Sequence, residues 1–203
     1  MGSVLTIERL TPSRRDDFLR FFDHEHGPAF ADNPDWAKCY CHFYHVPKAI
    51  VWKSLDATAN RTAMTARIEA AEMDGFLAYA GGDVVGWLNA QPRSKLPHCM
   101  ARMGIAAPPL DVPPQSAAAI VCFVIAPSWR RRGVARVLLR GALTSFAARG
   151  IRVIDAFPFN AGGSTDATDH YHGPVSLFRD AGFKVEAVHK DLTVMRKRLA
   201  SAH

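Results

Sequence analysis

The feature of the sequence that most restricts the fold is an uninterrupted apolar run that leads through an arginine-rich turn into an amphipathic pattern. The run Ala117–Ile125 has the length of a strand buried on both faces of a sheet. After the turn, apolar residues recur three and four positions apart as far as Phe146, and Gly150 follows, which predicts a helix over about 133–149. This order favours a sheet covered by helices.

The turn between the two, 130–135 (RRRGVA), has the composition of an anion-binding site. The first turn of a helix presents unpaired backbone N–H groups and the positive end of the helix dipole. Gly133 allows the backbone to approach a ligand closely, and arginine side chains add charge-assisted hydrogen bonds to phosphate oxygens. The turn lacks the Gly-Lys-Ser/Thr of a Walker A loop and the three spaced glycines of a dinucleotide fingerprint. It predicts a binding site for one compact polyanion.

The net charge of +6 is concentrated in this part of the chain. Between Ser128 and Arg152 there are seven arginines and no acidic residue, so the remainder of the chain carries a net charge of −1. A short basic segment suits a small phosphate ligand better than a duplex, and no zinc-finger spacing or RRM signature is present, so we expect no nucleic-acid partner. No apolar run is long enough to span a bilayer, so no membrane partner is expected.

The four cysteines are too few and too unevenly spaced for a disulfide framework, and the first residues lack a signal-peptide pattern. We therefore expect a cytoplasmic protein. Its length favours a single domain over residues 1–203. The remaining patterns predict strands over 4–10, 76–80, 84–89, 151–157, 183–188 and 192–197, and helices over 12–22, 57–73 and 174–181. Two segments, 23–52 and the proline-rich 92–115, are predicted to be irregular.

Two motifs and the order of the elements resemble the GNAT acyltransferase superfamily. The stretch 130–135 is similar to the Arg/Gln-x-x-Gly-x-Gly/Ala signature of that family, and 176–183 (SLFRDAGF) resembles its later Leu-Tyr-x-x-x-Gly-Phe segment. The resemblance implies an α/β GNAT-like fold, in which a central mixed β-sheet is flanked by helices.

The same resemblance implies a function. The protein would be an acetyl-CoA-dependent N-acetyltransferase that passes the acetyl group directly to a primary amine of a small molecule or peptide, with a homodimer possible and no metal expected. The pyrophosphate would lie on the turn and the pantetheine along the end of the apolar strand, so the implied cofactor-binding residues are Phe123, Val124, Ile125, Arg130, Arg131, Arg132, Gly133, Val134 and Ala135. The alternative is a non-catalytic module that only holds coenzyme A.

The catalytic residues are where the sequence departs from the family pattern. Phe178 occupies the position of the tyrosine that donates a proton in many members, and phenylalanine cannot donate. Tyr171, His170 and His172, just upstream, are the candidates for that role. Asp155 on the neighbouring strand is the candidate base, the alternative being an acid that faces solvent or pairs with an arginine. Cys122 could meet the acyl group as a nucleophile, but packing as a small hydrophobic residue is favoured.

Histidines, cysteines and acids are frequent in the first irregular segment. Side chains of these types can bind zinc, and the candidates are His24, His26, Cys39, Cys41, His42 and His45. Their spacing is not that of a usual zinc knuckle, so an aromatic-rich pocket wall is favoured. Between Phe21 and Ala37 the charged residues are all acidic, namely Asp23, Glu25, Asp32 and Asp35. This stretch either attracts a cationic amine or forms a solvated loop.

Overall fold

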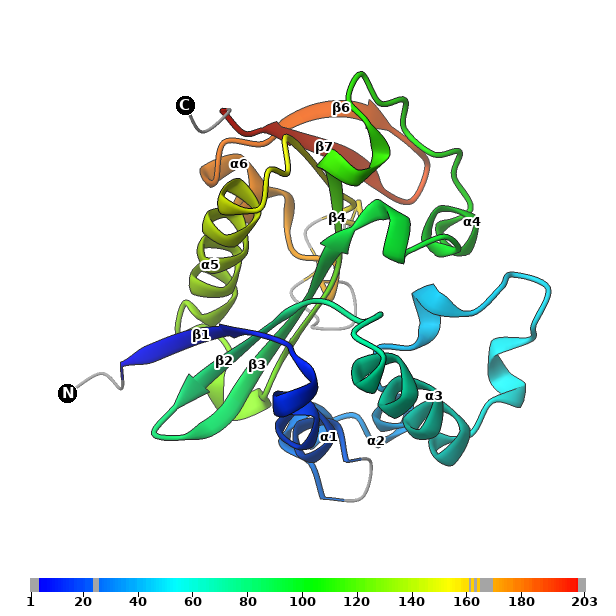
Figure 1. The fold of residues 1–203 in the computed structure, drawn as a ribbon, viewed down its shortest axis with the longest axis vertical. Coiled ribbons are helices and arrows are strands. Elements are labelled where there is room, and N and C mark those ends of the chain that lie inside the picture. Colours follow the sequence, from blue (N-terminus) through cyan, green and yellow to red (C-terminus); the bar gives the residue numbers. More distant parts are fainter. Residues whose placement is uncertain (1–3, 24–25, 161, 163, 165–169, 201–203) are drawn as a thin grey trace.

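The computed structural model describes residues 4–23, 26–160, 162, 164 and 170–200, and its frame is a mixed sheet of seven strands (Figure 1). The strands are β1 (Leu5–Arg9), β2 (Phe76–Ala80), β3 (Asp83–Pro92), β4 (Ala117–Ile125), β5 (Val153–Ala156), β6 (Lys184–Val188) and β7 (Thr193–Arg198). Their order across the sheet is β1-β2-β3-β4-β5-β7-β6. The β4–β5 pair is parallel and the other neighbouring pairs are antiparallel. The predicted central mixed sheet is confirmed.

Helices cover both faces of this sheet (Figure 1). One face is covered by α5 (Val134–Ala148) and α6 (Val175–Asp180). The opposite face is covered by α1 (Arg15–Phe22) and α3 (Ala57–Glu69), which pack against each other. Two short helices, α2 (Pro34–Ala37) and α4 (Cys99–Met103), lie in the connecting segments. None of the described helices has the length and apolar character to cross a membrane.

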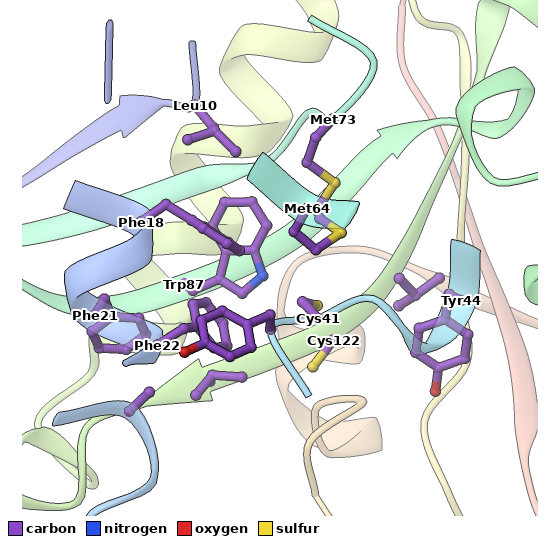
Figure 2. Close-up of a cluster of buried hydrophobic side chains, with 14 of the residues drawn as sticks. Leu10, Phe18, Phe21, Phe22, Cys41, Tyr44, Met64, Met73, Trp87 and Cys122 are labelled. Carbon is purple, nitrogen blue, oxygen red and sulfur yellow. The ribbon is translucent and has the colours of Figure 1, made fainter. Parts of the chain in front are cut away.

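Each face has its own apolar core, and the sequence periods explain which residues enter it. On the α5 face, the buried stripe of that helix contains Val134, Leu138, Leu139, Ala142 and Phe146. On the α1 face, the centre is Trp87 of β3, whose ring lies 5.0 Å from that of Phe18 in an edge-to-face arrangement (Figure 2). β4 separates the two cores, which is why its sequence is apolar throughout.

A β-bulge interrupts the pairing of β4 with β3. Cys122 is opposite Asn89 and Ile120 is opposite Ala90, so Val121 is the extra residue. Because a bulge breaks the alternation of a strand, Val121 and Cys122 both face the α1 core. β5 pairs with β4 only as far as Ile120, and the edge of β4 beyond the bulge therefore has no neighbouring strand on that side within the described part of the chain.

The irregular segments are more structured than the sequence suggests. The prediction that 92–115 contains no regular element is wrong, because α4 forms between its prolines, with Cys99 buried. Arg102 of this helix donates to the carbonyl oxygens of Val46, Pro47 and Ile50 at 2.7–2.8 Å, which ties the two irregular segments together. The helix expected over 57–73 ends earlier, at Glu69, because Ala71 has a left-handed backbone with φ of 54°.

Candidate functional site

A cavity of about 1090 Å³ lies where the arginine-rich turn, the unpaired edge of β4 and the first irregular segment meet. Its size is that of a site for a large ligand. Three groups of residues line it. The turn contributes Arg130, Arg131, Gly133, Val134, Ala135 and Arg136, and β4 contributes Cys122, Phe123, Val124 and Ile125. The third group is rich in aromatic rings: Phe22, Phe30, Trp36, Phe43, Tyr44, Trp52 and Tyr171.

The turn has the geometry of an anion cradle. Gly133 is the N-cap of α5 and has φ of 81°, and its carbonyl accepts the first helical hydrogen bond, from Val137 N at 3.1 Å. The amides at the start of the helix consequently have no partner within the helix, and its first turn contains no acidic residue. A Cβ atom added at Gly133 would meet no atom of the described residues within 4 Å, which leaves space beside the backbone for a ligand. These features fit a diphosphate.

The three arginines of the turn have different surroundings. Arg130 donates from Nε to the carbonyl of Ile125 at 3.2 Å, and its terminal nitrogens form a two-point ion pair with Asp32. Arg131 is exposed, lies in a left-handed conformation with φ of 62° and lines the cavity. The guanidinium of Arg132 lies over the ring of Trp129, 5.3 Å from its centre, and Arg132 is not among the described residues that line the cavity.

The backbone of β4 presents alternate amides to the cavity edge. Ala126 N donates to Val85 O on β3 at 3.0 Å, so by alternation the amide of Val124 faces β3, whereas those of Phe123 and Ile125 face the unpaired edge. Phe123 N donates to the carbonyl of Tyr171 at 2.6 Å. That donor is therefore engaged, and a bound thioester could use it only after the carbonyl of Tyr171 moves.

Tyr171 and His172, predicted as proton donors, are joined through Tyr44, which sequence reasoning missed. His172 donates from Nδ1 to the carbonyl of Phe157 at 2.6 Å, so its Nε2 is the acceptor for the Tyr44 hydroxyl. The ring of Tyr171 lies 4.6 Å from that of His172, and the hydroxyls of Tyr171 and Tyr44 are close enough to shift each other's pKa. Burial lowers the pKa of His172 to about 4 and raises the pKa of Tyr171 to about 12. Tyr171 lines the cavity, whereas His172 is buried behind it.

Asp155, predicted as the base, is fully buried in a group of ion pairs. Its carboxylate accepts from Arg196 at 2.7 and 3.0 Å and from Arg93 at 3.3 Å. It is not among the described residues that line the cavity. The structure therefore brings Tyr171 to the cavity and holds Asp155 away from it, in an environment that favours a structural role.

We expect Asp155→Asn to lower the free energy of unfolding by about 3 kcal/mol, because it removes the buried counter-charge of Arg196 and leaves that guanidinium only the more exposed Glu186, 3.2 Å away. Urea denaturation measures this. Asp111→Asn is the matched control, since Asp111 pairs with Arg198 and both side chains are exposed, so its stability should barely change. Unchanged stability of Asp155→Asn together with a large loss of turnover would instead support the role of a base.

Of the histidine and cysteine cluster, Cys39 and Cys41 line the cavity, whereas His26, His42 and His45 are not among the described residues that line it. Among the described residues, no group of three or more His, Cys, Asp or Glu side chains could hold a metal ion, and His24 and Glu25 lie outside those residues. His42 hydrogen bonds to Asn60 at 2.8 Å, and burial lowers the pKa of His45 to about 3. Asp32 and Asp35 line the cavity, the first of them paired with Arg130.

A family model described as the acetyltransferase (GNAT) family matches residues 16–163. The chain belongs to the GNAT acetyltransferase family. The resemblance drawn from the two sequence motifs is therefore confirmed. A search of curated protein sequences found no match.

Solved GNAT structures share the fold of this chain at low sequence identity. The ribosomal-protein-S18-alanine N-acetyltransferase of Escherichia coli is 12% identical, with 98% of this chain and 97% of that chain covered and a TM-score of 0.53. Salmonella typhimurium yncA, solved with acetyl-CoA, is 16% identical, with coverages of 98% and 95% and a TM-score of 0.53. The PaiA N-acetyltransferase of Thermoplasma acidophilum, solved with coenzyme A, is 12% identical, with coverages of 97% and 99% and a TM-score of 0.55.

Acetyl-CoA, predicted as the co-substrate, agrees with this GNAT membership and with the ligands of two of these neighbours. The tyrosine position of the family is filled here by Phe178, which is fully buried, with its ring 6.1 Å from that of Phe123. Gly173 lies against Phe178 so closely that a Cβ atom would come within 2.9 Å of its ring. Phe178 is thus a packing residue beside the cavity, and it has no hydroxyl to offer.

Proposed function

We propose that this GNAT protein is an N-acetyltransferase that transfers the acetyl group of acetyl-CoA directly to a primary amine of a small molecule or peptide. The observation that carries the proposal is the continuity of one cavity from the anion cradle at Gly133, past the unpaired edge of β4, to the ring-lined wall. Donor and acceptor can therefore meet in one space. Bringing two reactants together in a fixed orientation supplies much of the acceleration in such a reaction.

The chain's own groups would divide the work of binding. The amides at the start of α5 and the Arg131 guanidinium are placed to hold the diphosphate. The amide of Ile125 faces the unpaired edge of β4, where an extended pantetheine chain can pair with it as an added strand. The amide of Phe123, once released by Tyr171, would stabilise the negative charge that develops on the thioester oxygen.

Proton transfer would run through the tyrosines. The departing sulfur needs a proton, and the hydroxyl of Tyr171 is a donor in the cavity wall, next to Tyr44 and His172. Tyr44 donates to His172, so its oxygen would be available to accept from Tyr171 and orient the Tyr171 hydroxyl during proton transfer. β4 carries no carboxylate, so the amine is expected to enter as the neutral base or to lose its proton to water.

The proposal is tested by following thiol release from acetyl-CoA in the presence of a panel of amines, with mass spectrometry of the product. We expect turnover with at least one primary amine, a product heavier by one acetyl group on nitrogen, and kcat/KM that rises with pH until the amine is deprotonated. Binding of acetyl-CoA without turnover on any small or peptide amine would contradict the proposal.

The second candidate is a module that holds coenzyme A without catalysing transfer. It is favoured by one observation, the buried Phe178 at the position where many GNAT members have a tyrosine. The two candidates differ in a simple way. An enzyme releases free thiol faster when an amine is added, whereas a binding module retains acetyl-CoA unchanged at the same concentration of amine.

A further inference from the structure

Cys41 is held in an unusual conformation in the cavity wall. Tyr40 and Cys41 are consecutive non-glycine residues with positive φ, at 44° and 54°. Such backbone strain is tolerated where the surroundings fix it, and it is concentrated at functional sites. Here it turns Cys41 inward over β3 and β4, where the residue is buried and still lines the cavity.

Polar donors surround the sulfur of Cys41. Asn89 Nδ2 donates to it at 3.2 Å, and this amide is correctly oriented because Asn89 Oδ1 accepts from Gln91 Nε2 at 2.6 Å. The indole N–H of Trp87 is fully buried and has no hydrogen-bond partner among the described residues, and Figure 2 shows the nitrogen on the side of the ring that faces Cys41. Burial opposes ionisation of Cys41, but the polar groups around its sulfur, Asn89 among them, outweigh it and lower the pKa of Cys41.

A second thiol lies beside the first. Cys122 is the direct cross-strand partner of Asn89, and the bulge in β4 turns its side chain to the face where Cys41 lies. Figure 2 shows the two sulfur atoms next to each other in the same core. Hydrogen bonding to Cys41, together with burial, raises the pKa of Cys122 well above its ordinary value. The hydrogen bond from Asn89 to the Cys41 sulfur makes Cys41 the thiol of the pair that is favoured to ionise, with Cys122 as its neighbour.

We propose that Cys41 and Cys122 form a peroxide-sensitive modification site in the wall of the acetyl-transfer cavity. In the first step the Cys41 thiolate attacks one oxygen of hydrogen peroxide, an S–O bond forms, the O–O bond breaks and the departing hydroxide leaves as water after taking up a proton. In the second, the Cys122 sulfur attacks Cys41, the S–S bond forms, and the hydroxyl leaves as water with the Cys122 proton. Two thiols are oxidised and one peroxide is reduced to two water molecules.

The bond would link the segment after α2 to the central strand, across the wall that both residues share. It would fix the cavity in a conformation that excludes the acceptor, and oxidation would switch off transfer. This consequence rests on the proposed function, whereas the oxidation itself does not.

The experiment treats the full-length protein with a small excess of hydrogen peroxide and maps its cysteines by mass spectrometry without reduction. We expect a Cys41–Cys122 disulfide, with Cys41 consumed at least about tenfold faster than Cys99. Cys99 is the internal control because it lies in the same core, outside the cavity lining, and burial raises its pKa to about 11. A Cys39–Cys41 disulfide, or equal oxidation of Cys41 and Cys99, would overturn the proposal.

Single substitutions distinguish the attacking thiol, Cys41, from the resolving thiol, Cys122. In Cys122→Ser, Cys41 should lack its resolving thiol and proceed to the sulfinic acid, which thiol reductants do not reverse. In Cys41→Ser, Cys122 should remain unmodified at the same peroxide dose, and should that variant fail to fold, Cys122→Ser alone decides the assignment. Reversible oxidation of Cys41 in Cys122→Ser would count against it.

Activity is the final readout, each variant being compared with its own untreated sample. Peroxide should reduce acetyl transfer at least about tenfold in the wild-type protein and in Cys99→Ala, and dithiothreitol should restore it. Formation of the disulfide without loss of activity would overturn the switch while leaving the modification site in place. If no amine is ever acetylated, the mapped disulfide still tests the thiol pair, so the two proposals fail separately.

Discussion

Replacing Gly133 by valine is expected to raise the Kd for coenzyme A about a hundredfold. With φ of 81°, residue 133 lies in the left-handed region, which a β-branched side chain strongly disfavours. The backbone of the turn must change, and the amides at the start of α5 lose their alignment toward the diphosphate. Loss of two charge-assisted hydrogen bonds of about 1.5 kcal/mol each accounts for the size of the effect. Isothermal titration calorimetry with coenzyme A measures it.

The matched control lies at the other end of the same helix. Gly150 has φ of 75°, and a Cβ atom there would likewise meet no atom within 4 Å. Gly150→Val should therefore cost similar stability and leave the Kd for coenzyme A within about twofold of the wild-type value. Equal weakening of binding in both variants would assign the effect to the helix as a whole. Normal binding by Gly133→Val would remove the turn as the diphosphate site.

Replacing Tyr171 by phenylalanine is expected to lower kcat about a hundredfold and to leave the KM for acetyl-CoA nearly unchanged. The substitution removes only the hydroxyl, so the carbonyl of Tyr171 and its bond to Phe123 N remain. Burial raises the pKa of Tyr171 to about 12, so the donor keeps its proton across the usual assay range. In the wild-type protein kcat should accordingly show no alkaline decline below about pH 10. Steady-state kinetics over pH 6 to 10 test both statements.

Tyr79→Phe is the control for this experiment. The Tyr79 hydroxyl donates to Asp17 at 2.8 Å, and Tyr79 is not among the described residues that line the cavity. Its loss should leave kcat within about twofold of wild type, as for a group that never contacts the reactants. If Tyr171→Phe behaved in the same way, the proton would have to come from elsewhere. A comparable loss of kcat in Tyr44→Phe would support the hydrogen-bonded chain that orients Tyr171.

The fold was predictable from sequence where local patterns and burial act together. The apolar run of β4, the helical stripe that ends at Phe146 and Gly150 beyond it, and the turn at Gly133 all carry their signals within a few residues. α4 was missed because five residues between prolines are too few to show a period. Its stability comes from tertiary contacts, such as those of Arg102, that no local pattern contains.

Of the candidate site, only the turn proposed to bind the diphosphate has a signal in the sequence. That turn is formed by consecutive residues, whereas the rest of the cavity wall brings together groups that are far apart in the chain. Tyr44 and His172 are 128 residues apart, and Asn89 and Cys41 are 48 apart. The one sequence signal for Tyr44 and Cys41 was the density of rings and thiols in 38–45, which indicates a pocket wall without saying which atoms meet. The bulge at Val121, which turns Cys122 toward Cys41, has no signature in an all-apolar strand.

The three consecutive arginines of the turn, 130–132, make three different kinds of interaction in this protein. Arg130 connects the turn to Asp32 through a two-point ion pair, which requires the planar guanidinium that lysine lacks. The guanidinium of Arg132 lies over the Trp129 ring, a contact that again depends on a planar group. Arg131 contributes charge at the cavity, and there a lysine would serve nearly as well. Replacing these arginines by lysine one at a time should therefore have a different effect at each position. A sequence motif that treats the three positions as equivalent does not show this difference.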